Sequence, residues 1–318
     1  MPPNRPRCTT DIPGLEWLTT DDGSLTLWDS HLQETYHSGC GAIAESLVVY
    51  LVHSGVYHRL AGGLPTSVFE MGLGTGTNLL LTAALAEHFA APLEYWAIEN
   101  RLLPSSVYNG LQLNQYLPRA VAINQALDLH QCLNGNPDSF QCNADQFQPM
   151  ASDADRKISL DHFSKISALS STFSEWMDKT IATGLTPARS TFPMDSGPNK
   201  TTSLQSLQYQ TGSLSANVTL HLLTGDALEF INSRVIDQYS ERFCAVYFDP
   251  FSPEANPALW TRGTLQAMHQ LLQPGGTFTS YCVKSRIRRL LQEIGFSVFK
   301  VCGPAGGKRE VLRATKQS

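Results

Sequence analysis

An aspartate at the end of a buried strand is the residue of this chain best placed to do chemistry. Residues 245–248 are apolar and β-prone, and Asp249 follows them directly. Pro250, Pro253 and Pro257 then forbid regular strand pairing beyond it. Because an open α/β sheet binds its ligand at the carboxyl ends of its strands, we expect Asp249 to point into a cleft and accept hydrogen bonds from a substrate amine, helped by the carbonyls that follow it. The alternative is an aspartate that only forms a turn.

A glycine-rich loop lies earlier in the chain, between an apolar strand at 67–71 and a helix predicted over 79–89. A strand, a glycine loop and a helix in this order allow the backbone to close against a nucleotide-type ligand. The spacing is Gly-x-Gly-x-Gly and differs from the Gly-x-Gly-x-x-Gly of dinucleotide enzymes. A purely structural turn is the alternative. The predicted cofactor-binding residues of this region are Glu70, Gly72, Gly74, Gly76 and Asn78.

Two further predicted strands are followed by acidic residues. The strand at 93–98 ends in Glu99, 23 residues after Gly76, where a carboxylate that holds a ribose diol is expected. The strand at 218–223 is followed by Asp226, which is placed to receive an adenine amino group. Taken alone, Glu99 also fits a solvated strand end and Asp226 a helix cap. Together with Glu70 and Asp249 they form a pattern typical of methyltransferases that use S-adenosyl-L-methionine.

These residues need a sheet to bring them together. From Asn78 onward the sequence alternates between helix and strand patterns, which predicts an α/β fold with a parallel, Rossmann-like sheet. The last two strands, around Val298 and Val311, are joined by a short Gly/Pro-rich connection and are expected to form an antiparallel pair at the sheet edge. Residues 24–60 are expected to form a small N-terminal β-element and a helix that cover the cleft. Tyr36 and His37 would then lie near the site; a surface turn is the alternative.

The remaining segments divide the chain. Residues 1–14 are predicted to be a disordered lead-in, and residues 15–129 and 218–318 to be the two halves of one methyltransferase domain. Between them, residues 130–217 form a polar insertion that is rich in Ser, Thr, Gln and Asn, with one helix-prone piece near 158–183. We expect a short linker to be able to replace about residues 135–212.

Composition limits the class of protein. The chain has 318 residues, 42% of them apolar, and no apolar run approaches the ~20 residues that a membrane span requires. The seven scattered cysteines predict neither a disulfide framework nor a metal site and agree with a cytoplasmic location. The net charge is −5, yet nine basic residues against two acidic ones follow from Lys284 onward. Because local fields steer a polyanion, this end of the chain predicts a nucleic-acid contact; a solvated basic helix is the alternative.

Several segments together resemble one family, the MnmD-type tRNA methyltransferases that correspond to the N-terminal half of MnmC. The resemblance covers about residues 15–125 and 218–315 and departs from the family at Leu73, where Phe is usual, at Thr77, where Leu is usual, and in the insertion. The matching segments are 22–27, 34–38, 41–46, 70–78, 249–260, 272–277 and 306–312.

The resemblance implies methyl transfer from S-adenosyl-L-methionine to the 5-aminomethyl group of (2-thio)uridine at the tRNA wobble position. It places Asp249 beside the transferred methyl group as the catalytic residue. Substrate contacts are expected from Tyr36 and Phe251, and contacts with phosphates of the anticodon stem-loop from Lys308 and Arg309. We further expect a monomer, no metal ion, and a separate flavin-dependent or upstream tRNA-modifying enzyme as a partner.

Other functions remain open at this point. An aminopropyltransferase shares the fold, although its glycine loop carries an extra acidic residue that residues 72–76 lack. A nicotinamide oxidoreductase needs the other glycine spacing. A small-amine N-methyltransferase and a non-catalytic tRNA-binding protein are further alternatives.

Overall fold

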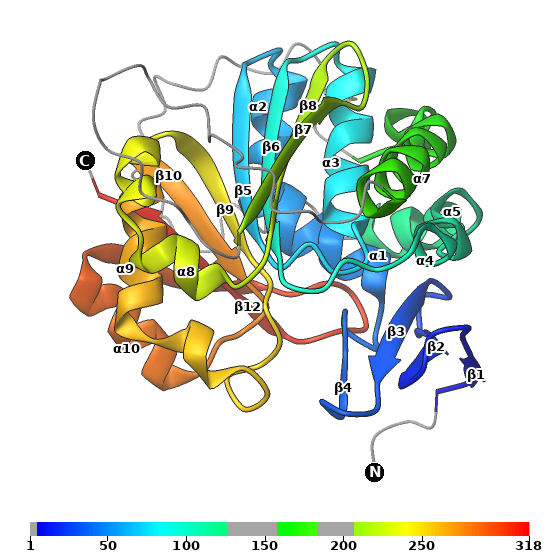
Figure 1. Ribbon diagram of the computed structural model, residues 1–318, viewed down its shortest axis with the longest axis horizontal. Helices are drawn as coiled ribbons and strands as arrows, with labels where there is room; N and C mark the ends of the chain where they lie inside the picture. The colour runs from blue at the N-terminus through cyan, green and yellow to red at the C-terminus, as the bar shows by residue number, and fades with distance from the viewer. Residues whose placement is uncertain (1–4, 126–157, 183–206, 318) are drawn as a thin grey trace.

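A mixed sheet forms the centre of the molecule. The computed structural model describes residues 5–125, 158–182 and 207–317. Five parallel strands occupy the middle of the sheet, β12 lies antiparallel between β10 and β11, and β7 lies antiparallel on β8 at the other edge (Figure 1). The strands, in spatial order, are β11 (Phe296–Cys302), β12 (Glu310–Lys316), β10 (Leu272–Ser280), β9 (Phe243–Phe248), β5 (Thr66–Met71), β6 (Leu93–Glu99), β8 (Val218–Thr224) and β7 (Gln208–Ser213).

The central strands are apolar on both faces because helices cover both sides of the sheet. All six residues of β9 are buried, as is typical of a parallel strand. Successive side chains alternate between two core clusters: Val68 and Tyr247 pack into one, and Phe69 and Phe248 into the other. The predicted Rossmann-like α/β fold and the antiparallel pair β11–β12 are therefore confirmed.

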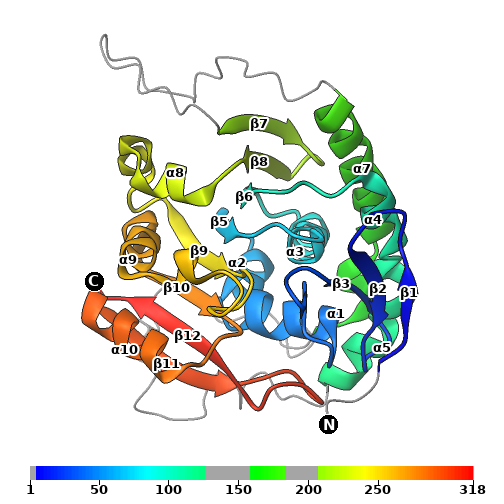
Figure 2. The same cartoon turned by 60° about the horizontal axis from the view of Figure 1, so that its bottom comes forward.

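Two groups of helices flank the sheet (Figures 1 and 2). The first group packs into the cluster that contains Val68 and comprises α1 (Ala42–Glu45), a π-helix (Ser46–Val52), α2 (Val56–Ala61), α3 (Thr77–His88), α4 (Ser105–Gly110), α5 (Leu113–Gln125), a 3-10 turn (Leu160–Phe163) and α7 (Ile166–Ala182). The second group packs on the opposite face and comprises α8 (Ala227–Asn232), two 3-10 helices (Arg234–Tyr239 and Pro257–Trp260), α9 (Arg262–Leu271) and α10 (Ser285–Ile294).

A small antiparallel sheet precedes the main one, as predicted. It consists of β1 (Arg7–Thr9), β2 (Leu15–Thr19), β3 (Leu25–Asp29) and β4 (Glu34–Thr35). Leu15 and Leu27 anchor it to the main core. Strand β1 lies before residue 14, and Arg5 forms an ion pair with Asp21 at 2.8 Å, so the predicted disordered lead-in is not an accurate description of residues 5–14.

The segment 130–217 is more than a peripheral insertion. The predicted helix is present as α7, and its apolar positions at helical spacing, including Phe173 and Met177, are fully buried in the main core. Strand β7 belongs to the main sheet and was not predicted, because its sequence is polar. Replacing residues 135–212 with a linker would therefore remove parts of the core. Residues 126–157 and 183–206 lie outside the described residues, and the domain boundaries stay a prediction.

Membrane spanning and disulfide bonding are two further properties of the described residues. Within the described ranges, no helix combines the length and apolarity needed to cross a bilayer. Cys302 is disulfide-bonded. A disulfide at this position was not predicted from the scattered cysteines.

Candidate functional site

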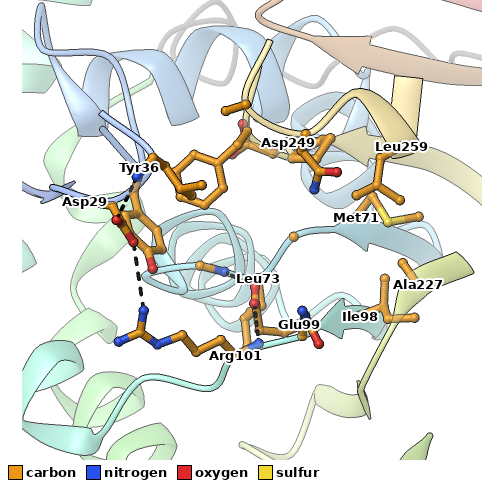
Figure 3. A pocket seen from close by; sticks show the side chains of 18 of the residues that line it. Asp29, Tyr36, Met71, Leu73, Ile98, Glu99, Arg101, Ala227, Asp249 and Leu259 are labelled. Atoms are coloured by element: carbon orange, nitrogen blue, oxygen red, sulfur yellow. Dashed lines mark hydrogen bonds and ion pairs between the residues drawn. The ribbon is translucent and has the colours of Figure 1, made fainter. Parts of the chain in front are cut away.

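The carboxyl ends of β5, β6, β8 and β9 open into a cavity of about 680 Å³. The turn between β3 and β4 and the residues after β4 cover it from the other side, with Asp29, Tyr36 and His37 among the lining residues (Figure 3). The predicted cleft is therefore present, and the N-terminal β-element contributes to its wall. Of the predicted site residues, those that line the cavity are Tyr36, Gly72, Gly74, Glu99, Asp226, Asp249 and Phe251.

The glycine loop follows β5 and enters α3. Gly72 has φ +91°, and a Cβ there would lie 3.0 Å from the carbonyl oxygen of Asp249. Gly76 has φ +72°, and a Cβ there would lie 3.0 Å from the ring of Phe173. Both positions therefore require glycine for conformation and for space. Gly72 allows the loop to lie against the end of β9. Gly76 does not line the cavity, and its lack of a side chain allows α3 to pack against α7.

Glu99 ends β6 and lines the cavity. Its carboxylate accepts hydrogen bonds from the backbone N–H groups of Gly74, at 2.9 Å, and Arg101, at 2.8 Å. Burial raises the pKa of Glu99, and these backbone donors oppose the rise. The carboxylate thus ties the glycine loop to the end of β6. Arg101 continues across the cavity toward Asp29, with 3.9 Å between Nη1 and Oδ2 (Figure 3).

Asp226 is exposed and caps α8, where its Oδ1 accepts the N–H of Leu228 at 2.9 Å. The helix-cap interpretation therefore holds for one of its oxygens. Because Asp226 also lines the cavity, its side chain remains within reach of a ligand there.

Glu70 and Asn78 are buried behind the cavity and do not line it. Glu70 accepts hydrogen bonds from Asn78 Nδ2 at 2.9 Å and from the Tyr95 hydroxyl at 2.8 Å. Burial raises the pKa of Glu70 to about 8. The amide of Asn78 also donates to Asp249 Oδ2 at 3.0 Å. In this structure Glu70 and Asn78 therefore support Asp249, in contrast to the predicted direct contact with a cofactor.

Asp249 follows β9, and its carboxylate lies near side chains from the π-helix, α3 and α1. Its Oδ1 accepts a 2.5 Å hydrogen bond from the hydroxyl of Tyr50 in the π-helix, and its Oδ2 accepts from Asn78 in α3. Its side chain is only 5% exposed although it lines the cavity. Burial, followed by the nearby charge of Glu45, raises the pKa of Asp249 well above its usual range. The carboxylate is held in place and is a stronger base than an exposed aspartate.

The carbonyls after Asp249 are already engaged. Pro250 O accepts the hydroxyl of Tyr281 at 2.8 Å, and Phe251 O accepts the indole N–H of Trp260, also at 2.8 Å. They hold the loop in shape, so the predicted role of these carbonyls as free acceptors for an amine is not supported. The ring of Phe251 meets that of Tyr36 edge-on, with 5.0 Å between the centroids, and both residues line the cavity.

The two predicted phosphate-binding residues lie outside the cavity. Lys308 and Arg309 are exposed on the loop between β11 and β12. The ammonium group of Lys308 lies 4.2 Å from the ring centroid of Tyr281, whose hydroxyl donates to the loop after Asp249. This cation–π contact holds the basic loop near the wall of the site.

Sequence reasoning missed Tyr50, Glu45 and Arg101. Tyr50 lies in the apolar run Ser46–Val52 and looked like a core residue. Glu45 lies in the segment 41–46 that resembles the family but was not singled out as a site residue, and Arg101 lies in a loop. The acidic strand ends, in contrast, were recognisable from spacing alone. Within the residues that the structure describes, no group of three or more His, Cys, Asp or Glu is arranged to hold a metal ion.

Comparisons with known proteins agree with this geometry. Residues 194–317 match the model of a family described as S-adenosyl-L-methionine-dependent methyltransferases. The structure of MnmC2 from Aquifex aeolicus resembles this chain with a TM-score of 0.55 at 20% identity, over 96% of this chain and 72% of that one. A spermidine synthase from Thermotoga maritima gives a TM-score of 0.43 at 10% identity, over 98% of this chain and 72% of that one. The family match over residues 194–317 agrees with the predicted S-adenosyl-L-methionine-dependent methyltransferase, and the fold of the chain is similar to that of MnmC2.

Proposed function

We propose that this methyltransferase methylates the 5-aminomethyl nitrogen of (2-thio)uridine at the wobble position of tRNA. The observation that carries the proposal is Asp249, a buried carboxylate that reaches the cavity beside the glycine loop and is fixed by Tyr50 and Asn78. An alkylamine is mostly protonated at neutral pH and must lose a proton before it can attack, so its acceptor site needs such a base. The motifs shared with the MnmD-type enzymes support the choice of amine.

The residues around the cavity fit the cofactor. A Cβ at Gly72 would lie 3.0 Å from the carbonyl oxygen of Asp249, so glycine at this position lets the loop lie against the end of β9 at the wall of the cavity. Gly72, Gly74, Glu99 and Asp226 would hold the nucleoside and the amino acid part of S-adenosyl-L-methionine, with Glu99 as partner of the ribose hydroxyls. When bound, the cofactor supplies an electrophilic methyl group on a sulfonium sulfur.

Asp249 would orient the amine and accept its proton. The raised pKa of Asp249 brings its basicity closer to that of an alkylamine, which favours proton transfer. A carboxylate also stabilises the positive charge that develops on nitrogen as the N–C bond forms. Since Asp249 is fixed on two sides, its main contribution is to keep donor and acceptor aligned.

The tRNA would approach across the loop between β11 and β12. Lys308 and Arg309 would bind phosphates of the anticodon stem-loop, and the edge-on pair of Tyr36 and Phe251 would contact the uridine inside the cavity. The contact of Lys308 with Tyr281 links this surface to the loop that carries Asp249. The monomeric state and a separate partner enzyme stay predictions.

The test is mass spectrometry of wobble nucleosides after incubation of the protein, S-adenosyl-L-methionine and tRNA that carries 5-aminomethyl-2-thiouridine. We expect this nucleoside to gain one methyl group, and Asp249→Asn to slow the reaction about 100-fold or more. Glu254→Gln, which removes an exposed carboxylate from the same loop, is the matched control. Methylation of free polyamines in place of tRNA would support the small-amine alternative, and tRNA binding without turnover the non-catalytic one.

A further inference from the structure

A buried histidine connects Asp249 to a second buried carboxylate. Nδ1 of His37 lies 3.9 Å from Asp249 Oδ2 and 3.9 Å from Glu45 Oε2, and all three side chains are at most 5% exposed. On the other side of the ring, Nε2 is 2.9 Å from Thr75 Oγ1. Within the residues that the structure describes, Nδ1 has no hydrogen-bond partner. A buried nitrogen without a partner is costly, which calls for an explanation.

We propose that His37 carries the proton of the substrate amine from Asp249 to Glu45, and that Glu45 stores it during methyl transfer. The inference rests on the proposed function, because it requires an amine acceptor at Asp249. His37 and Glu45 are positioning and relay residues, since neither has to touch the substrate. The tautomer that donates from Nε2–H to Thr75 leaves the lone pair of Nδ1 facing both carboxyl groups.

The reaction releases one proton, and the cavity must dispose of it. The N–H bond of the ammonium group breaks and the proton goes to Asp249 Oδ2. The freed electron pair of nitrogen forms the N–C bond, while the electrons of the S–C bond leave with the sulfur. If the proton stayed on Asp249, this residue could not stabilise the positive charge of the product amine. Transfer through Nδ1 to Glu45 restores the charge of Asp249 without opening the cavity to water.

The surroundings make both carboxylates stronger proton acceptors and keep the histidine neutral. Burial lowers the pKa of His37 to about 4 and raises the pKa of Glu45. Glu45 keeps one backbone donor, the N–H of Ser38 at 2.8 Å. Several further ionisable groups act electrostatically on Glu45, His37 or Asp249. They are Asp22 from the turn between β2 and β3, Tyr50 from the π-helix, Glu70 from β5, Tyr95 from β6, Tyr281 after β10 and Lys308 from the loop between β11 and β12. The exposed Lys308 opposes the rise of the Glu45 pKa.

Glu45 could instead serve only to anchor the loop at Ser38. Glu45→Gln separates the two roles because the amide oxygen still accepts the N–H of Ser38 but the side chain cannot store a proton. The experiment measures single-turnover methyl transfer to tRNA carrying 5-aminomethyl-2-thiouridine, at saturating cofactor, from pH 6.5 to 10. Cofactor affinity and melting temperature are measured in parallel. His37→Asn is the second variant, and Glu254→Gln controls for loss of a carboxylate.

We expect Glu45→Gln and His37→Asn to slow the reaction about 10-fold or more at pH 7 with unchanged cofactor affinity. The loss should shrink toward pH 10, because a growing fraction of an alkylamine with a pKa near that of lysine, about 10.4, then arrives already deprotonated. A loss that is equal at every pH, or a variant rate equal to the wild-type rate, overturns the relay while the proposed function stands. Absence of turnover by the wild-type protein would overturn both.

Discussion

The hydroxyl of Tyr50 donates a 2.5 Å hydrogen bond to Asp249 Oδ1, although 199 positions separate the two residues in the chain. Tyr50 lies in a π-helix on one face of the main sheet, and Asp249 follows β9 at the carboxyl end of that sheet. The bond reaches the oxygen that Asn78 leaves free, so both oxygens of the carboxylate are oriented. Much of what positions the proposed base therefore comes from the N-terminal quarter of the chain.

Tyr50→Phe removes a donor that stabilises the ionised form of Asp249. The pKa of Asp249 should rise further, and the acidic limb of the pH–rate profile should move to higher pH. A hydrogen bond to a charged group contributes about 1.5–3 kcal/mol, which corresponds to about one to two pH units. Single-turnover rates measured against pH will show the shift. Tyr247→Phe is the matched control, because that tyrosine is also fully buried, with its ring centroid 5.4 Å from that of Tyr50, and its hydroxyl is 3.5 Å from Thr82. An unshifted profile would contradict a role of Tyr50 in setting the basicity of Asp249.

Glu99→Ala should weaken binding of S-adenosyl-L-methionine by about 1–3 kcal/mol, because the ribose loses a charged partner. Titration calorimetry measures this directly. Part of the loss will come from the glycine loop, since Glu99 also holds the N–H of Gly74. Glu94→Ala is the control: Glu94 is the second residue of the same strand, does not line the cavity, and pairs with Arg242. Equal affinity of wild type and Glu99→Ala would mean that the ribose binds elsewhere.

Replacing Lys308 and Arg309 together with alanine should weaken tRNA binding and reduce the slope of log K against log salt by about one to two. Cofactor binding should not change, because neither side chain lines the cavity. Lys300→Ala provides the comparison, since Lys300 is also exposed on this strand pair but its charge is balanced by Glu310, 2.6 Å away. A double variant with the wild-type salt slope would place the tRNA on another surface.

Glu70→Gln should change how stability depends on pH. Burial raises the pKa of Glu70 from 4.5 to about 8, so between these values the folded protein binds more protons at this residue than the unfolded chain does. The free energy of unfolding therefore falls as pH rises through this window, and it stops falling above about 8. Glutamine lacks this titration and can still accept from Asn78. Relative to wild type, the variant should gain more than about 1 kcal/mol between pH 5 and pH 8 in urea unfolding. Parallel curves would show that Glu70 titrates normally.

The strand-end residues could be predicted from the sequence because each follows directly from its own strand. Gly72, Glu99 and Asp249 meet at one edge simply because parallel strands end there. His37 was expected near the site, but its contacts with Glu45 and the place of Tyr50 could not be predicted in the same way. Their contacts depend on how the N-terminal sheet and the π-helix pack on the main sheet, which no local pattern encodes.

Residues 130–217 were predicted to be a polar insertion, although parts of this segment belong to the main sheet and the core. Strand β7 has the polar sequence QYQTGS, because an edge strand with intermediate or exposed side chains needs no apolar alternation. Composition alone therefore assigned it to a polar insertion. The apolar spacing of α7 was visible, but not the fact that this helix packs against α3 and α4.

Phe173→Ala tests whether α7 is part of the core. Phe173 is fully buried, packs edge-on against Tyr108 at 4.8 Å between centroids, and would meet a Cβ at Gly76. Its truncation should lower the free energy of unfolding by about 3–5 kcal/mol, the usual cost of removing a buried phenylalanine side chain. Ile181→Ala, on the same helix but 40% exposed, should cost far less. Because the ring of Phe173 supports the turn that begins α3, cofactor affinity should fall as well. If Phe173→Ala unfolds at the same urea concentration as wild type, the helix is peripheral and the segment can be shortened without loss of the fold.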